Sequence, residues 1–165
     1  MTTPPFRISI LEKQDRTAFR SGVETLDRYF RDQAGQDMRR KMSACYVLEE
    51  AATGLIAGYY TLSAADIPIN DAPSDLTKRL PRYPTLPVVR LGRLAVDEQF
   101  RGRKLGSALL ANAASRAASS DVAMFAMIVD AKDDDAVAFY RHHGFVAYGS
   151  SPMTLIAPLK DLLPE

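Results

Sequence analysis

Hydrophobic and polar positions follow two periods along this chain, and together they predict an α/β fold with a mixed central sheet flanked by helices. Short apolar runs predict strands at 6–11, 44–48, 56–62, 88–96, 123–129, 145–148 and 153–159. Apolar residues spaced three and four apart predict helices at 22–42, 106–119 and 133–143. The order of these elements is that of one α/β domain, which we expect to cover residues 1–165.

Turn-forming residues separate these elements. Gly54 lies between two strands and predicts a hairpin, and Asp133 is a suitable N-cap for the helix that follows it. Gly144 is expected to end that helix, and Pro158 places the last strand at an edge or at its own end. Residues 68–87 hold five of the ten prolines, which predicts an irregular insertion with one helical turn at 74–80.

The composition of the 165 residues is that of a soluble globular protein, with 47% hydrophobic and 25% charged residues. No apolar run approaches the ~18 residues of a membrane helix, and no signal-peptide core begins the chain. The single cysteine, Cys45, excludes an internal disulfide framework and predicts a small buried hydrophobe. We therefore expect a cytoplasmic protein with no metal site.

Positive charge gathers in one segment although the net charge is only +1. Residues 77–95 contain no acidic side chain and five cations, namely Lys78, Arg79, Arg82, Arg90 and Arg93. Such a patch can bind a polyanion even when the whole chain is balanced, and a solvated surface explains it equally well. A second basic group, at residues 28–41, shares its helix with aspartates, which favours a solvated face of mixed charge.

A glycine-containing basic loop is the clearest candidate for ligand binding. The apolar strand at 91–96 leads into Arg101–Ser107, and that loop opens an alanine-rich helix. Backbone N–H groups at a helix N-terminus favour an anion, so the arrangement predicts a pyrophosphate cradle. Both the dinucleotide fingerprint and the P-loop motif are absent. The alternative is a structural turn that binds nothing.

Four features together resemble the GNAT family of acetyl-CoA-dependent N-acetyltransferases. They are the strand 91–96, the loop 101–106, the segment Ala138-Phe139-Tyr140-Arg141-His142-His143-Gly144-Phe145 and the element order. The loop is similar to the family pattern R/Q-x-x-G-x-G/A, and the segment to A-x-x-F-Y-x-x-x-G-F. One departure concerns Lys104, which stands where the pattern has its first glycine.

The resemblance implies a set of residues that hold acetyl-CoA. The backbone of 94–96 would pair with the pantetheine arm, and the loop would hold the pyrophosphate. Asp133 and Phe139 would flank the cofactor, although Asp133-Asp134-Asp135 stands where the family often has asparagine and also suits a helix N-terminus. The implied cofactor-binding residues are Leu94, Ala95, Val96, Arg101, Gly102, Arg103, Lys104, Leu105, Gly106, Ser107, Asp133 and Phe139.

By the same resemblance, Tyr140 occupies the position of the catalytic acid. A thiol has a pKa near ~8.5 and a phenol near ~10, so a tyrosine beside the sulfur can protonate a departing thiolate. Core packing is the alternative role for Tyr140. A general base stays open: His142 and His143 suit the chemistry but lie at a helix end, and the carboxylates of Glu49, Glu50 and Asp66 are not distinguished by their spacing.

Nearly the whole chain, from about residue 6 to 159, resembles the GNAT toxins of bacterial toxin–antitoxin pairs. The similarity rests on residues 19–37, on 58–63, on the proline-rich insertion and on 87–97. It implies acetylation of the α-amine of aminoacyl-tRNA, which blocks translation. The basic patch at 78–93 would then contact the phosphates of the tRNA. The resemblance also implies a homodimer and a ribbon-helix-helix antitoxin. The antitoxin, and not the toxin itself, would bind operator DNA.

Two other classes of function remain. A housekeeping GNAT enzyme acting on a small amine or a protein N-terminus would need no basic patch and no antitoxin. A non-catalytic module that senses acyl-CoA would function without Tyr140. The sequence leaves open which aminoacyl-tRNA is preferred and whether Lys104 weakens cofactor binding.

Overall fold

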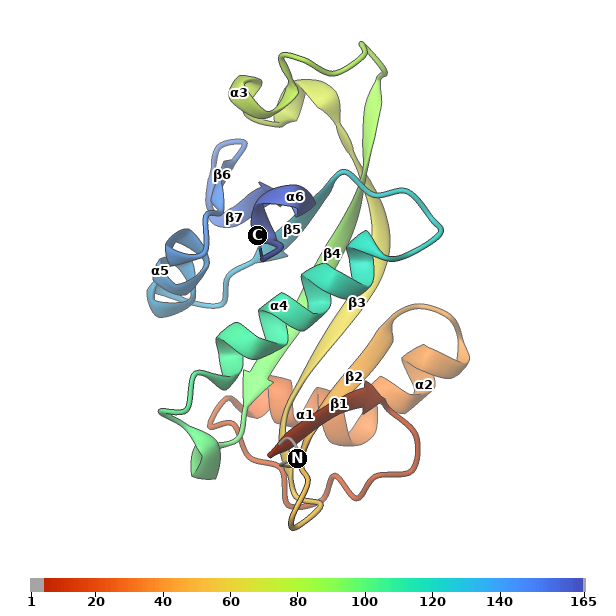
Figure 1. Ribbon diagram of the computed structural model, residues 1–165, viewed down its shortest axis with the longest axis vertical. Coiled ribbons are helices and arrows are strands. Elements are labelled where there is room, and N and C mark those ends of the chain that lie inside the picture. Colours follow the sequence, from red (N-terminus) through yellow and green to blue (C-terminus); the bar gives the residue numbers. More distant parts are fainter. Residues whose placement is uncertain (1–4, 165) are drawn as a thin grey trace. The chain divides into compact units, whose positions relative to one another are not determined.

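A computed structural model describes residues 5–164 and contains a seven-stranded sheet (Figure 1). The strands are β1 (Phe6–Ile10), β2 (Ala44–Glu50), β3 (Ile56–Pro68), β4 (Thr85–Val96), β5 (Ala126–Asp130), β6 (Val146–Tyr148) and β7 (Ser151–Pro158). Their order in the sheet is β1-β2-β3-β4-β5-β7-β6. β4 and β5 are parallel, whereas β1–β2, β2–β3, β5–β7 and β6–β7 are antiparallel. The predicted mixed sheet is therefore confirmed.

Helices connect most of the strands. They are α1 (Glu24–Asp32), α2 (Ala34–Arg39), α3 (Ser74–Thr77), α4 (Leu105–Ala118), α5 (Asp134–His142) and α6 (Leu159–Leu162), with 3₁₀ turns η1 (Ile69–Asp71) and η2 (Glu98–Phe100). The positions of α4 and α5 agree with the sequence prediction to within one residue at either end. The short helix α6 was not predicted. No helix within residues 5–164 is both long and apolar enough to cross a membrane.

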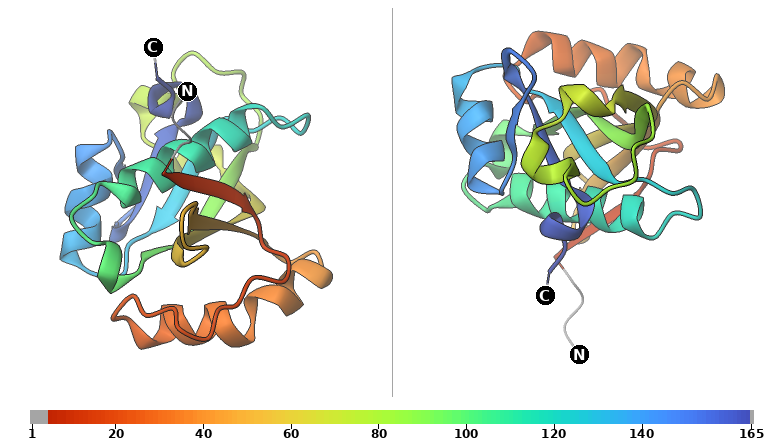
Figure 2. Two further views of the ribbon diagram at one scale, coloured as in Figure 1. Left: turned by 60° about the horizontal axis from the view of Figure 1, so that its bottom comes forward. Right: turned by 90° about the horizontal axis from the view of Figure 1, so that it is seen from above.

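The single helix predicted at 22–42 is wrong, because the chain breaks it into α1 and α2 (Figure 2). Gln33 leaves the helical region, with φ −122° and ψ −30°, and Gly35 follows in a position where glycine weakens a helix. Phe30 and Ala34 are both fully buried on either side of the break. The apolar periodicity therefore runs through the break, which is why the pattern predicted one helix.

The chain forms two compact units that alternate along the sequence. Unit 1 comprises residues 1–63 and 92–113, and unit 2 comprises 64–91 and 114–165. In unit 1, Phe30 stacks on Tyr59 with ring centroids 4.2 Å apart, and Phe19 meets both rings edge-on. This aromatic cluster fixes α1 against the sheet, because each buried aromatic ring removes a large apolar area from water.

The core of unit 2 includes the insertion that the prolines predicted to be irregular. Val88, Ile128 and Ile156 from three strands pack with Ile67 and Ala72, and half-buried Leu76 and Leu80 pack against this cluster. Regular elements reach into both ends of the predicted insertion, since β3 runs on to Pro68 and β4 begins at Thr85, and α3 covers the predicted helical turn in part. Pro158 is the last residue of β7, an end position as predicted.

Candidate active site

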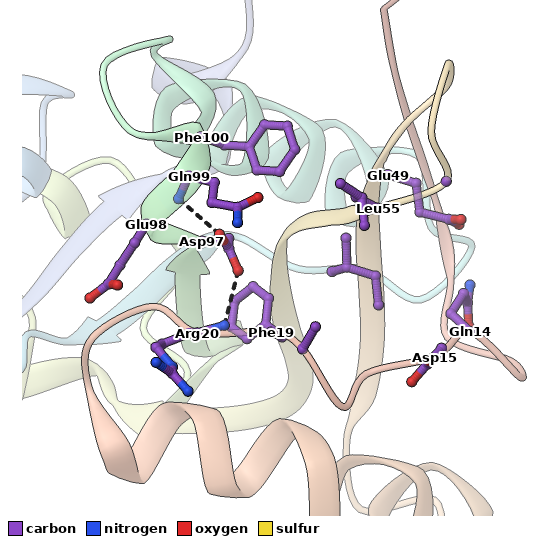
Figure 3. A pocket seen from close by; sticks show the side chains of 13 residues that line it. Gln14, Asp15, Phe19, Arg20, Glu49, Leu55, Asp97, Glu98, Gln99 and Phe100 are labelled. Carbon is purple, nitrogen blue, oxygen red and sulfur yellow. Dashed lines mark hydrogen bonds between the residues drawn. The ribbon is translucent and has the colours of Figure 1, made fainter.

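The candidate phosphate loop begins at a buried carboxylate in unit 1. Asp97 Oδ2 accepts a hydrogen bond from the Arg20 amide at 2.9 Å, and its Oδ1 accepts one from the Gln99 amide at 2.9 Å (Figure 3). The Glu98 amide in turn donates to the Arg20 carbonyl at 2.9 Å. These bonds attach the end of β4 to the segment that precedes α1, so they fix where the loop 101–107 starts.

Two residues of the loop have a left-handed backbone. Gly102 has φ +82° and Lys104 has φ +59°. Glycine adopts this region freely, whereas a residue with a Cβ adopts it at a cost of about 1 kcal/mol. Lys104 therefore adopts a backbone region that glycine, the residue of the family pattern at this position, reaches without strain.

The arginines of the loop are held by neighbouring groups. Arg101 Nη2 donates to the Ser21 carbonyl at 2.6 Å and lies 3.9 Å from Glu98. Arg103 lies 3.7 Å from Glu50. Both guanidinium groups remain more than half exposed, so each retains N–H donors that can face an anion. Leu105 and the half-buried Gly106 and Ser107 then open the 14-residue helix α4.

Replacing Lys104 by glycine separates backbone strain from charge. We expect Lys104→Gly to raise the free energy of unfolding by about 0.5–1 kcal/mol, because the left-handed strain disappears. We also expect the affinity for acetyl-CoA to fall about threefold, because a cation leaves the loop. Chemical denaturation and titration calorimetry measure the two effects. A simultaneous gain in affinity would mean that the lysine distorts the loop.

Tyr140 lies in unit 2 with its ring buried and only 7% of the residue exposed. The ring meets Phe139 and Phe145 edge-on, at 5.2 and 5.3 Å between centroids. Within residues 5–164 its hydroxyl makes no hydrogen bond, and burial raises its pKa well above the usual value of 10.0. The phenol therefore stays protonated at neutral pH, as a proton donor must.

The N-cap predicted for α5 is confirmed, because Asp133 Oδ1 accepts from the Ala136 amide at 2.8 Å. Asp134 and Asp135 lie in the first turn of α5, where the positive end of the helix dipole stabilises a carboxylate. At the other end, His142 is exposed, and half-buried His143 meets the Phe139 ring at 4.8 Å. Burial lowers the pKa of His143.

Strand β4 supplies the backbone predicted to pair with the pantetheine arm. Its parallel pairing with β5 joins Val88–Leu91 to Ala126–Val129, and Leu94 and Val96 follow as half-buried positions around buried Ala95. Beside this segment, Thr61 is fully buried, and its Oγ1 has no hydrogen-bond partner within residues 5–164. A side chain on Gly92 would crowd this hydroxyl, because its Cβ would lie only 3.0 Å from the Thr61 oxygen.

We expect Thr61→Val to raise the free energy of unfolding by about 1 kcal/mol, since it removes an unsatisfied buried hydroxyl and keeps the shape. Denaturant unfolding measures the change. Thr154→Val is the matched control, because the Thr154 hydroxyl donates to Asp130 at 2.9 Å; this variant should be neutral or destabilised. Destabilisation by Thr61→Val would show that the Thr61 hydroxyl has a partner in solution.

The five predicted tRNA-binding cations have different surroundings. Lys78, Arg79 and Arg82 are exposed in the insertion of unit 2. Arg90, also in unit 2, forms a 2.5 Å ion pair with Asp130. Arg93, in unit 1, lies over the Tyr29 ring at 3.4 Å, and the Tyr29 hydroxyl donates to Asp37 at 2.7 Å. The last two arginines are thus partly engaged within the protein.

A cavity of about 620 Å³ lies in unit 1 beside Asp97 (Figure 3). Its walls come from segments around residues 14–20, 49–56 and 97–100, and nothing in the sequence pattern connects these three segments. Its carboxylates already have partners: Asp15 accepts from Thr17 at 2.7 Å, and Glu49 and Glu98 lie 4.0 and 3.9 Å from arginines. We assign no acid or base to this cavity.

Neither Glu50 nor Asp66 is distinguished as a general base by its surroundings. Glu50 accepts from Thr53 at 2.8 Å and pairs with Arg103, and Asp66 is exposed on β3. Burial raises the pKa of Cys45 to about 12, in agreement with its prediction as a small hydrophobe. Within the described residues, no three His, Cys, Asp or Glu side chains are grouped as metal ligands.

Sequence reasoning missed the segment that supports the loop. Asp27 is buried, and its carboxylate accepts hydrogen bonds from the Ser21 amide, at 3.0 and 3.1 Å, and from the Ser21 hydroxyl, at 2.5 Å. The Ser21 carbonyl is the acceptor for Arg101. Ser21 and Asp27 were visible as polar residues near the start of a predicted helix, but their link to residue 101 depends on the tertiary fold.

The chain is similar to known proteins over most of its length. The Acetyltransferase (GNAT) domain family matches residues 41–147. A tRNA-acetylating toxin of Mycobacterium tuberculosis is 36% identical over 159 residues, which cover 95% of this chain and 92% of the toxin.

Solved structures show the same similarity. AtaT complexed with acetyl-methionyl-tRNAfMet has a TM-score of 0.86 and 28% identity, over 95% of this chain and 96% of that one. A mutant of the AtaT toxin bound to the C-terminus of the antitoxin AtaR and acetyl-CoA has a TM-score of 0.80 and 26% identity, over 96% of both chains.

Proposed function

The chain belongs to the GNAT acetyltransferase family, in the branch of the tRNA-acetylating toxins, and from this premise we propose that it transfers acetyl from acetyl-CoA to the α-amine of aminoacyl-tRNA. The observation that carries the proposal is the 36% identity to a tRNA-acetylating toxin over 95% of the chain. We extend the acetyltransferase domain to all of residues 1–165. An acetylated amine cannot attack in peptide-bond formation, so the product would stop translation.

The chemistry of the loop 101–107 fits acetyl-CoA. Its donors are backbone N–H groups at the start of α4 together with Arg101, Arg103 and Lys104. These groups suit a pyrophosphate, which carries negative charge and many acceptor oxygens. The backbone of Leu94–Val96 is proposed to pair with the pantetheine arm, with Asp133 and Phe139 as further contacts. When bound, acetyl-CoA supplies an activated thioester carbonyl.

Tyr140 is the proposed catalytic acid. The attacking amine nitrogen forms a bond to the carbonyl carbon, the C–S bond breaks, and Tyr140 gives its proton to the departing sulfur. The raised pKa of this phenol keeps it protonated at neutral pH, so its proton is available as negative charge builds on the departing sulfur. The amine loses its own proton to water, and an α-amine ester-linked to tRNA has a low pKa that aids this loss.

The proposed acceptor and partners follow from the relatives. Structures of the relative AtaT contain acetyl-methionyl-tRNAfMet and the antitoxin AtaR. We propose that this protein likewise acts on a charged tRNA in the cytoplasm and is neutralised by an antitoxin. A homodimer, a ribbon-helix-helix fold for the antitoxin and DNA binding through the antitoxin alone remain predictions.

Cell-free translation tests the proposal at the level of its consequence. Protein synthesis should stop when the enzyme and acetyl-CoA are both present, and it should continue when acetyl-CoA is omitted. Addition of fresh aminoacyl-tRNA should restore synthesis for as long as it remains unacetylated. Unimpaired translation in the presence of both components would refute the proposal.

A further inference from the structure

A second concave surface lies in the insertion of unit 2, and its chemistry suits an anion. This cavity of about 340 Å³, here called the insertion pocket, has eight lining residues. Ile69, Ala72 and Leu80 form its apolar part. The remaining five can all donate hydrogen bonds, and none is a carboxylate: Asn70, Ser74, Thr77, Lys78 and Arg82.

The two cations of the insertion pocket are available for a ligand. Lys78 and Arg82 are both exposed, and within residues 5–164 neither forms an ion pair. A charged side chain without a partner loses nothing inside the protein when it turns to an anion. Arg90 and Arg93 differ in this respect, because Asp130 and the Tyr29 ring already engage them.

The carboxylates nearest in sequence belong to other surroundings. Asp71 is the acceptor for the Tyr148 hydroxyl at 3.5 Å. Asp75 lines a neighbouring cavity together with Asp161, Lys160, Arg79 and Lys78, and it does not line the insertion pocket. The insertion pocket therefore keeps two positive charges with no acidic side chain in its lining, and its electrostatics favour a phosphate group.

The walls of the insertion pocket are well supported. Ala72 is buried in the core of unit 2, where half-buried Ile69 and Leu80 pack against the same cluster. The Ile69 amide donates to the Pro84 backbone carbonyl at 3.0 Å, and the Lys78 amide donates to the Ser74 backbone carbonyl at 2.9 Å. These bonds fix the backbone on which the donors stand, which limits the entropy lost when a ligand binds.

We propose that the insertion pocket binds a backbone phosphate of the RNA acceptor, an inference that rests on the proposed function. Lys78 and Arg82 neutralise the phosphate, and the Ser74 and Thr77 hydroxyls and the Asn70 amide complete its hydrogen bonds. Phosphate contacts of this kind set the register of an RNA and carry no base specificity. The pocket thus positions the tRNA and leaves the choice of amino acid to other residues.

The proposal separates three cations that the sequence treats alike. Arg79 lies between Lys78 and Leu80 in the chain but lines the neighbouring cavity with Asp75 and Asp161. Arg79 does not line the insertion pocket, whereas of these two cavities Arg82 lines only that pocket and Lys78 lines both. Arg79 is the matched control for Arg82, because it has the same side chain, is also exposed and lies in the same insertion.

Direct binding of uncharged tRNA, measured over a range of salt concentrations, tests the proposal. We expect Arg82→Gln and Lys78→Gln each to weaken binding about fivefold and to reduce the slope of log Kd against log salt by about 0.7–0.9. Arg79→Gln should change Kd less than twofold. Thr77→Val, which keeps every charge, should weaken binding about threefold with an unchanged slope. All four variants should bind acetyl-CoA as the wild type does.

Two results would overturn the proposal: equal losses in Arg79→Gln and Arg82→Gln, as expected for a diffuse basic surface, or no loss in Arg82→Gln. An excess of inorganic phosphate that competes with acetyl-CoA but leaves tRNA binding intact would also contradict it. Failure of the proposed function gives a different result, because wild-type protein would then bind uncharged tRNA in a salt-dependent manner and yet acetylate no charged tRNA.

Discussion

Tyr140→Phe is expected to lower kcat about 10²–10³-fold while changing the Kd for acetyl-CoA less than about twofold. The phenylalanine ring retains the edge-on contacts to Phe139 and Phe145, and only the hydroxyl is lost. Since that hydroxyl has no hydrogen-bond partner within residues 5–164, stability should change by less than about 1 kcal/mol. Pre-steady-state acetyl transfer and calorimetry of acetyl-CoA binding give the two quantities.

Tyr148→Phe is a matched control for Tyr140→Phe. It removes a tyrosine hydroxyl from the same unit, one that donates to Asp71 at 3.5 Å, and should leave kcat near that of the wild type. If Tyr140→Phe retains kcat, the catalytic role is wrong. If it loses acetyl-CoA binding and turnover to the same degree, Tyr140 has a structural role.

Asp97→Ala is expected to have the largest effect on stability, a loss of about 2–4 kcal/mol in the free energy of unfolding. The buried carboxylate accepts hydrogen bonds from the Arg20 and Gln99 amides, both at 2.9 Å, and alanine leaves both donors without a partner (Figure 3). The start of the loop 101–107 then loses its attachment, so the affinity for acetyl-CoA should fall about tenfold. Denaturant unfolding and calorimetry measure the two losses.

Asp97→Asn is the graded control. Its single carbonyl oxygen accepts one of the two hydrogen bonds, so its loss of stability should be about half that of alanine. Asp15→Asn serves as a surface control, because the Asp15 carboxylate is exposed and bonds only to nearby Thr17. An Asp97→Ala protein as stable as the wild type would show that this carboxylate does not hold the loop.

Local pattern was sufficient for most elements and for the N-cap at Asp133. The apolar run 123–129 predicted a buried strand, and β5 at Ala126–Asp130 has four buried residues, so this strand was visible without a structure although it begins three residues later. The break at Gln33 was not, because buried residues on both sides of it preserve the helical period. The break itself lies at Gln33, where the backbone leaves the helical region, and Gly35 follows it.

Contacts between residues far apart in the chain could not be predicted from the sequence. Asp97 and Arg20 lie 77 positions apart, and nothing in either neighbourhood indicates the other. The basic patch shows the same limit: composition grouped Arg79, Arg82, Arg90 and Arg93, but the structure gives each a different environment. The sequence shows how many cations a segment contains but not which of them can bind a ligand. That availability depends on the carboxylates and aromatic rings that the fold places beside each cation.

Transfer of labelled acetyl from acetyl-CoA to a pool of charged tRNAs tests the central claim most directly. Uncharged tRNA, free amino acids and a protein N-terminal peptide serve as the other acceptors. The account predicts label on charged tRNA alone, released with the amino acid when the ester is hydrolysed. Label on free amino acids or on the peptide, with charged tRNA unmodified and acetyl-CoA binding intact, would contradict it.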